Sequence, residues 1–268
     1  MRRVYWLVAL CVYQLAFAYD IADFTRDAKA HHERYLNELN GLQLDVTGTI
    51  TQPGHESYSI DAKYYTRGKS WRTDATLRQT GKEEGFPITV LFDGQQIWGN
   101  LLGMKLKVSR GDVDNRVRGY LYWEQPAAGS AIAGEETVNG HPCWVITTPL
   151  RESDGTKVTM RSWYDKEHFV LVQSESTLDT KPVRMEFSDF REVHKGYVIP
   201  HAMRAVQSDV QIVNAQIVSV ASGDAISSSQ FDSASLDGKD FPDMAELMRT
   251  MQIFGKVFTN EVTKLLKD

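Results

Sequence analysis

Apolar residues recur every three or four positions near both ends of the chain, which predicts two amphipathic helices. The first spans about residues 21–39 and is followed by Asn40–Gly41, a pair typical of a helix end. The second spans about residues 243–266, with acidic residues near its start and lysines near its end, as the helix dipole favours. Each helix therefore has one apolar side that must be buried against another part of the protein.

Between the helices the period changes to two, because apolar and polar residues alternate over residues 42–50, 58–64, 71–77 and several later segments. The turns between these segments include Asp93–Gly94 and Asn139–Gly140, which are strong hairpin signals. Many short strands at this spacing predict a single antiparallel sheet, strongly curved, or a barrel. The predicted fold class is mainly β with some α, and the two helices are expected to cover the apolar face of the sheet.

The first residues have the order of a secretory signal peptide. Two arginines precede an apolar stretch over residues 4–17, which ends in Ala16–Phe17–Ala18 with small residues where a signal peptidase needs them. We expect cleavage after Ala18, so that the mature protein begins at Tyr19 and is exported to the periplasm. The alternative is an uncleaved anchor, but the stretch is shorter than the roughly 20 residues that span a bilayer.

The charge and the cysteine content limit the kinds of partner. The formal net charge of −5 becomes −7 when the two arginines of the signal peptide are removed, so nucleic acid, which needs a basic face, is excluded as a partner. No later stretch is apolar enough to span a membrane. Cys143 is the one cysteine of the mature chain, so we expect no internal disulfide and a buried thiol. A chain of this length is expected to form one domain.

The sequence carries no recognised motif for catalysis, phosphate binding or metal binding. His141 and Cys143 are expected on the same face of a strand, but no family signature supports a catalytic pair. His31 and His32 are expected to point about 100° apart on a helix, which makes them a poor metal pair. The histidines are interpreted as solvated surface residues. We expect no catalytic residue, no metal and no cofactor, so that the protein is not an enzyme; a hydrolase is the weakest alternative.

Four segments, in this order and spacing, are similar to one known family. They are Gly134–Trp144 (GEETVNGHPCW), Met160–Lys166 (MRSWYDK), Met185–Arg191 (MEFSDFR) with Ile199–Pro200–His201 after it, and Ser228–Asp232 (SSQFD). These segments resemble the LolA-like family of periplasmic proteins that sort lipoproteins to the outer membrane. The resemblance extends from the first helix to about Leu236, which is nearly the whole mature chain.

The resemblance implies an unclosed β-barrel, in which one antiparallel sheet curls around an apolar cavity with helices as a lid. It also implies a periplasmic carrier that binds acyl chains of lipoproteins or lipids, with inner- and outer-membrane transport proteins as further partners. The implied organisation is a signal peptide over 1–18, a LolA-like domain over 19–239, and a C-terminal amphipathic helix over 240–268 that extends past the family's usual end. We expect this helix to cover one end of the cavity, with docking on a partner as the rival role.

Strand alternation selects the apolar and aromatic residues that would line such a cavity. They are Leu44, Val46, Ile60, Tyr64, Trp71, Val90, Trp98, Leu106, Trp144 and Trp163. An error of one residue in register would turn the whole set of any strand to the opposite face. Two alternatives stay open: the residues form a dry core, or the fold serves as an envelope sensing or protein-interaction module.

Overall fold

A computed structural model describes residues 19–51, 57–101, 103–108, 126–151, 157–178, 181–208 and 210–241. The elements are α2 (Ile21–Glu38), β1 (Leu42–Thr51), β2 (Ser57–Arg67), β3 (Ser70–Gln79), β4 (Gly85–Phe92), β5 (Ile97–Leu101), β6 (Met104–Val108), β7 (Ala131–Val138), β8 (His141–Arg151), β9 (Lys157–Asp165), β10 (Leu171–Leu178), β11 (Lys181–His194), β12 (Tyr197–Gln207), β13 (Val210–Ser222) and β14 (Lys239–Phe241), with three short 3₁₀ helices, η2 (Gly223–Ala225), η3 (Ser228–Phe231) and η4 (Ser233–Ser235). The predicted signal peptide lies outside the described residues.

The helix α2 begins and ends where the sequence predicts. The side chain of Asp20 accepts hydrogen bonds from the backbone N–H groups of Ala22 (2.8 Å) and Asp23 (2.9 Å), which satisfies donors that the first turn leaves free. After the helix, Asn40 and Gly41 both adopt positive φ angles (51° and 100°), which turns the chain into β1.

The strands form one sheet of 14 strands in the order β14-β6-β5-β4-β3-β2-β1-β13-β12-β11-β10-β9-β8-β7. β14 pairs with β6 in parallel, and the other neighbouring strands pair antiparallel. Within the described residues, β7 and β14 each have a strand neighbour on one side, so the sheet is not closed. A mainly β fold with one unclosed antiparallel sheet is therefore confirmed, and β14 is a parallel addition to it.

The C-terminal extension begins differently from the prediction. Residues 240 and 241, assigned from sequence to the helical extension, belong to β14. Residues 242–268, which hold the predicted amphipathic stripe, lie outside the described residues.

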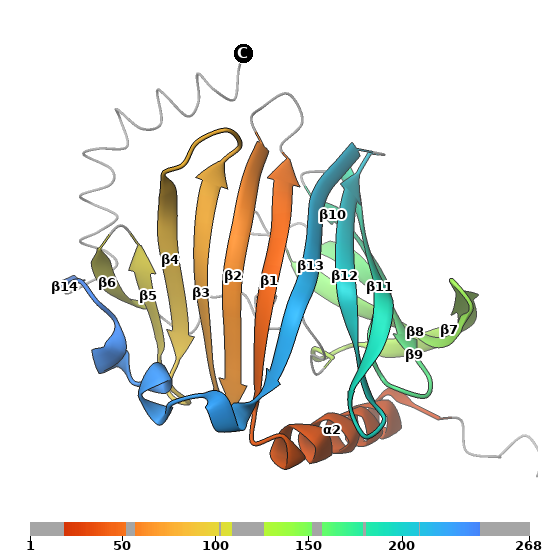
Figure 1. Ribbon diagram of the computed structural model, residues 1–268. Helices are drawn as coiled ribbons and strands as arrows, with labels where there is room; N and C mark the ends of the chain where they lie inside the picture. The colour runs from red at the N-terminus through yellow and green to blue at the C-terminus, as the bar shows by residue number, and fades with distance from the viewer. Residues whose placement is uncertain are drawn as a thin grey trace, which may run out of the picture.

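The sheet curls, and α2 lies across one end of the curl (Figure 1). We call the sheet face that contacts α2 the inner face. Tyr35 and Leu39, near the end of α2, pack with apolar residues of β1, β2, β3 and β12. Phe24 and Ala28, near its start, pack with Ile146 of β8 and Tyr164 of β9. The helix thereby joins the two halves of the sheet, as a cover over one end of the inner face.

The segment η2–η4 is held to the strands by two arginines. Arg67 donates hydrogen bonds to the carbonyl oxygens of Gly223 and Ile226, the latter at 2.6 Å. Arg72 pairs with Asp74 at 2.8 Å and donates to the Ser235 hydroxyl at 2.8 Å. Arg72 lies next to Trp71 on β3 and therefore points to the opposite, outer face of the sheet.

The turn at Asn139–Gly140 has the geometry that the sequence predicts for a type I′ hairpin. The φ angles are 49° for Asn139 and 84° for Gly140, and both are positive as that turn requires. A Cβ at Gly140 would meet no atom within 4 Å, so any cost of substitution comes from the backbone angle and not from a clash.

Replacing Gly140 with Val is therefore expected to destabilise the protein by about 1–2 kcal/mol, because a β-branched residue tolerates positive φ poorly. Urea unfolding measures this change. Asn139→Gly is the control and should leave the midpoint nearly unchanged, since glycine adopts positive φ readily. Equal midpoints for Gly140→Val and the natural sequence would contradict the turn geometry.

Candidate functional site

The inner face of β1 to β4 is mainly apolar. Cross-strand partners point to the same face, and the rows Leu44–Tyr64–Thr73–Val90 and Gly48–Ile60–Leu77–Phe86 run across the four strands. The register of these four strands is unbroken, so the alternation read from the sequence holds along each strand.

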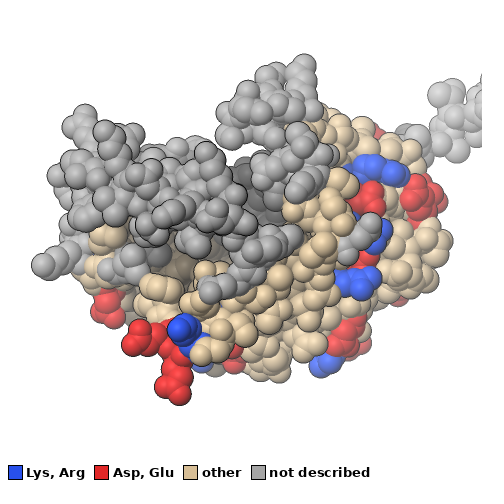
Figure 2. Space-filling view, turned by 90° about the horizontal axis from the view of Figure 1, so that it is seen from above, with Lys and Arg blue, Asp and Glu red and all other residues tan. Residues whose placement is uncertain are grey.

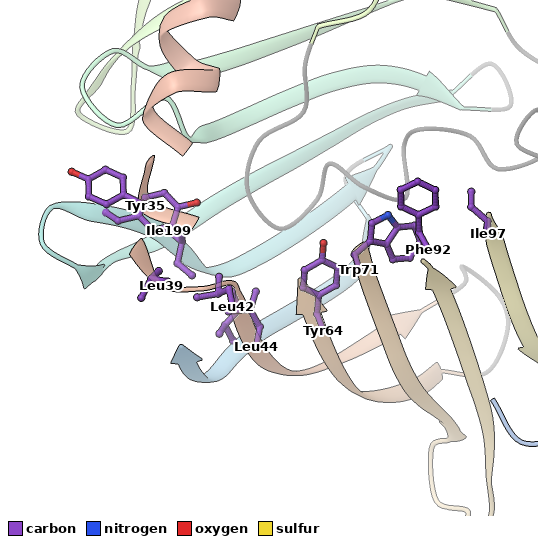
Figure 3. Close-up of a cluster of buried hydrophobic side chains, with 11 residues drawn as sticks. Tyr35, Leu39, Leu42, Leu44, Tyr64, Trp71, Phe92, Ile97 and Ile199 are labelled. Atoms are coloured by element: carbon purple, nitrogen blue, oxygen red, sulfur yellow. The ribbon is translucent and has the colours of Figure 1, made fainter. Parts of the chain in front are cut away.

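Burial decreases along this face from α2 toward the opposite end. Near α2, a cluster that includes Leu42, Leu44, Trp71 and Phe92 is almost completely buried (Figure 3). At the other end, apolar side chains of the same face meet solvent. We call this the open end and define it by Ile50, Tyr58, Ile60, Leu77 and Phe86. Phe86 is 56% exposed, and Ile50 and Tyr58 are each 37% exposed.

The open end gathers exposed apolar side chains on one face of the sheet. Exposed large apolar residues that lie together on one face of a sheet mark a binding surface more often than isolated ones do. In the view from above, the Lys, Arg, Asp and Glu side chains that can be seen lie toward the periphery of the molecule (Figure 2). The surface is therefore suited to an apolar ligand.

The second half of the sheet also contributes to the inner face. Trp144 of β8 pairs with Tyr164 of β9, and both pack in the cluster beneath the start of α2. The ring of Tyr19 stacks on Trp144 with centroids 4.6 Å apart. Trp144 is thus a half-buried aromatic side chain between α2 and the sheet.

The structure brings eight of the ten predicted residues to the inner face. They are Leu44, Val46, Ile60, Tyr64, Trp71, Val90, Leu106 and Trp144. Leu44, Tyr64 and Trp71 are buried in the cluster near α2, and Val46 and Val90 pack against it. These five residues lie on the neighbouring strands β1 to β4, and Leu106 lies on β6, whereas Trp144 lies on the other half of the curl.

The other two predicted residues, Trp98 and Trp163, lie on the outer face. Ile97 pairs with Phe92 on the inner face, so the next residue, Trp98, points outward, and its Nε1 donates to Asp93 at 3.0 Å. Trp163 pairs with Val145 in a separate outer cluster, and its Nε1 donates to Glu136 at 2.8 Å. Polar partners for both indoles explain why these large residues are stable outside the inner face.

Several inner-face residues were missed from the sequence. Phe92 follows the same alternation as Val90 on β4, so the signal for it was present, whereas Ile97 lies across the hairpin on β5, where it pairs with Phe92. Tyr197 and Ile199 of β12 also belong to the cluster near α2, but their contact with Tyr35 and Leu39 joins segments far apart in the chain. No local pattern predicts that contact.

The cavity on the inner face of β1, β11, β12 and β13 is small. It has a volume of about 60 Å³ and is lined by residues that include Val46, Phe187 and Ile217. Ligand pockets usually have about 300–1,000 Å³. This cavity is therefore a packing defect beside the apolar surface rather than a complete binding pocket.

His32 is a buried polar residue at the contact between α2 and the sheet, so the interpretation of the histidines as surface residues is wrong for it. Its Nε2 lies 3.1 Å from the carbonyl oxygen of Phe169, which can only accept, so Nε2 carries the proton. Its Nδ1 then accepts from the Tyr197 hydroxyl at 3.1 Å. Burial lowers the pKa of His32 to about 3, which keeps the ring neutral. His201 is also buried.

Acid is expected to weaken the fold through His32. The pKa is lower in the folded than in the unfolded protein, so below about pH 6.5 the unfolded chain binds a proton that the folded chain does not. Stability is full above that pH and should fall by about 2 kcal/mol between pH 7 and pH 5. Burial lowers the pKa of His31 as well, which acts in the same direction.

Urea unfolding as a function of pH tests this prediction with His32→Gln and, as a comparison, His31→Gln. The His32→Gln protein should be less stable at pH 7 but should lose less stability on acidification. An unchanged pH slope in His32→Gln would exclude His32 as the source.

Cys143 and His141 lie on the same face of β8, as predicted, but their side chains do not form a catalytic pair. The Cys143 thiol donates to the backbone oxygen of His141 at 3.2 Å, while the His141 ring contacts Asp165 at 3.0 Å. Cys143 is fully buried, and burial raises the pKa of its thiol to about 11, which disfavours the nucleophilic thiolate.

The described residues contain no group of three or more His, Cys, Asp or Glu side chains placed to hold a metal ion. In the same part of the chain, no helix has both the length and the apolar character needed to cross a membrane.

Neither a protein-family model nor a curated protein matches the sequence. Solved structures do match the fold. A domain from Vibrio parahaemolyticus, assigned to outer membrane lipoprotein sorting, is 12% identical; the match covers 79% of this chain and 96% of that one with a TM-score of 0.57. A DUF1329 family protein from Desulfovibrio piger is 15% identical, with 78% and 99% covered and a TM-score of 0.50. A LolA superfamily protein from Nitrosomonas europaea is 12% identical, with 74% and 92% covered and a TM-score of 0.48.

At these identities the likeness shows a shared fold. The resemblance to lipoprotein-sorting proteins that the sequence indicates is therefore confirmed for the fold.

Proposed function

We propose that this chain, which shares its fold with a lipoprotein-sorting domain, is a carrier that shields acyl chains of lipoproteins or lipids on the inner face of its sheet. The observation that supports this most is the open end, where Ile50, Tyr58 and Phe86 expose apolar side chains on the same face. A protein that used this face as a dry core alone would gain stability by covering these side chains.

The energetics of such binding need no specific polar contact. Each methylene moved from water to an apolar surface contributes about 0.8 kcal/mol. Part of one acyl chain along Ile60, Leu77 and Phe86 is therefore enough for useful affinity. The proposed lining consists of the eight predicted residues on the inner face together with the open end.

The proposal includes export to the periplasm. The two arginines, the apolar stretch and the Ala16–Phe17–Ala18 end of residues 1–18 support a cleaved signal peptide. The carrier domain would then span residues 19–239, with the 240–268 extension as an additional element. N-terminal sequencing of the exported protein should begin at Tyr19, and an intact Met1 would contradict cleavage.

Two neighbouring residues on β3 provide a matched test of the inner face. Leu77 pairs with Ile60 and Phe86 on the inner face, whereas Thr76 pairs with Asp61 and Pro87 on the outer face. Leu77→Lys places a charge in the proposed binding surface, and Thr76→Lys places the same charge one residue away beside Asp61.

We expect Leu77→Lys to weaken the binding of parinaric acid, a fluorescent fatty acid, by at least about tenfold, since about 1.5–3 kcal/mol of apolar burial is lost. Thr76→Lys should stay within about twofold of the natural protein. Thermal unfolding of both variants checks that they are folded. Equal affinity of the two folded variants, or no binding by the natural protein, would contradict the proposal.

A further inference from the structure

The polar atom of the Trp71 side chain, Nε1, is buried without a hydrogen-bond partner. Three buried side-chain polar atoms in the described part of the chain lack a hydrogen bond: His31 Nε2, Asp45 Oδ1 and Trp71 Nε1. The other oxygen of Asp45 accepts from Ser219 at 2.7 Å. His31 is half-buried, and its ring can leave Nε2 as an unprotonated acceptor. An indole N–H is always a donor, so Trp71 is the least satisfied of the three.

This lack of a partner contrasts with the two outer-face tryptophans. Trp98 donates to Asp93 and Trp163 donates to Glu136. Buried donors are nearly always paired, because burial without a partner loses the hydrogen bond that water would make. Trp71 is 5% exposed, so an unpaired N–H at this place is costly to the fold. An acceptor supplied by a ligand would remove that cost.

The position of Trp71 suits the polar end of a ligand. Trp71 is the second residue of β3, directly after the turn at Arg67–Ser70, and its partner Phe92 ends β4. The indole is therefore near the rim of the sheet. Figure 3 shows its ring standing off the sheet on the same side as Tyr64 and Phe92. A ligand group that accepts a hydrogen bond from this N–H would therefore lie close to the edge of the sheet.

The distance from Trp71 to the open end suits one acyl chain. Leu77 is six residues further along β3, which corresponds to about 20 Å at the rise of a strand. The hydrocarbon core of a bilayer is about 30 Å thick, so one acyl layer spans about 15 Å. A chain of that length that starts at Trp71 would lie along the inner face and cover most of the distance to Ile60 and Leu77.

We propose that the acyl ligand is held by an ester or amide carbonyl oxygen, which accepts a hydrogen bond from Trp71 Nε1 while the hydrocarbon chain extends along β3 toward the open end. This inference rests on the proposed carrier function. A carbonyl fits better than a carboxylate, because a carboxylate would bring an unpaired charge among Tyr64, Phe92 and the other apolar neighbours. The contact pairs two groups that would otherwise be buried without partners.

Two ligands that differ by the carbonyl alone test this inference. Monopalmitoylglycerol has an ester carbonyl, and hexadecylglycerol has an ether at the same place. Each is used to displace parinaric acid from the full chain. We expect the natural protein to prefer the ester by about tenfold, the effect of one buried hydrogen bond.

Two variants locate the preference. Trp71→Phe keeps an aromatic ring but removes the N–H, so the ratio of ester to ether affinity should fall to within about twofold, whatever the change in affinity for both ligands together. Trp98→Phe removes an indole N–H on the outer face and should keep the preference. If Trp71→Phe does not fold, the ratio of ester to ether affinity in the natural protein is the remaining test of the carbonyl contact.

The outcomes separate this inference from the proposed function. Equal binding of ester and ether by the natural protein, or a preference that survives in folded Trp71→Phe, would overturn the carbonyl contact but leave the carrier function. Binding of neither glycerolipid and no parinaric acid would overturn both.

Discussion

Replacing Phe24 with Ala is expected to lower the free energy of unfolding by about 3–5 kcal/mol, the usual cost of removing a fully buried phenylalanine ring. Phe24 is completely buried, and its ring centroid lies 5.2 Å from that of Tyr164 and 5.9 Å from that of Phe169. It is the main apolar contact that fastens the first half of α2 to the inner face at β8 and β9. Its loss should loosen the cover over that end of the sheet.

Denaturant unfolding measures this effect, with Glu33→Ala as the control on the exposed side of the same helix. Glu33 makes one long ion pair with Lys29, at 3.8 Å, so its replacement should change stability by no more than about 0.5 kcal/mol. Similar stabilities of Phe24→Ala and Glu33→Ala would mean that α2 does not pack on the sheet as described.

Replacing Asp165 with Ala is expected to cost about 3 kcal/mol, because it removes a buried carboxylate that accepts from three partly buried donors. One oxygen of Asp165 accepts from the backbone N–H groups of Glu167 (2.9 Å) and His168 (2.8 Å), and the other contacts His141 Nδ1 at 3.0 Å. These bonds fix the turn between β9 and β10. The His141–Asp165 contact is therefore assigned a structural role.

Asp165→Asn separates the loss of an acceptor from the loss of a charge. The amide oxygen can still accept from the two backbone N–H groups, and the amide NH₂ can donate to the other neutral tautomer of His141. We expect a cost of about 1 kcal/mol or less for this variant. Equal destabilisation by Ala and Asn, measured by urea unfolding, would show that the turn does not depend on these hydrogen bonds.

Strand alternation predicted the inner face of β1 to β4 because these strands pair in an unbroken register. Residues of one strand that point to the inner face then meet inner-face residues of the next strand, most of which are apolar. The same reasoning was wrong for Trp98 and Trp163, which it placed on the inner face. Trp98 lies beneath Lys105 and Lys107, and Trp163 lies beneath Arg161, so cations and carboxylates stabilise both rings on the outer face.

The parts of the site that involve α2 depend on contacts between segments far apart in the chain. His32 bonds to Tyr197 and Phe169, which are separated from it by 165 and 137 residues. The sequence shows the amphipathic helix, but nothing local tells which strands its apolar side meets. The burial of His32 and the stacking of Tyr35 on Tyr197, with centroids 4.9 Å apart, therefore became evident from the structure alone.

The exposure gradient along the inner face could not be read from the sequence either. Leu42 and Ile50 are both apolar positions on β1, yet Leu42 is fully buried near α2 and Ile50 is exposed at the open end. Alternation predicts the face of a residue, whereas its depth depends on which elements cover that face. The open end, which supports the proposed function, is a property of the assembled sheet.

Mass spectrometry of lipid extracted from the purified full chain tests the carrier function most directly. We expect acyl lipid at a ratio near one molecule per chain, clearly reduced in Leu77→Lys and retained in Thr76→Lys. Absence of acyl lipid from the natural protein, both as purified and after incubation with phospholipid vesicles, would contradict it.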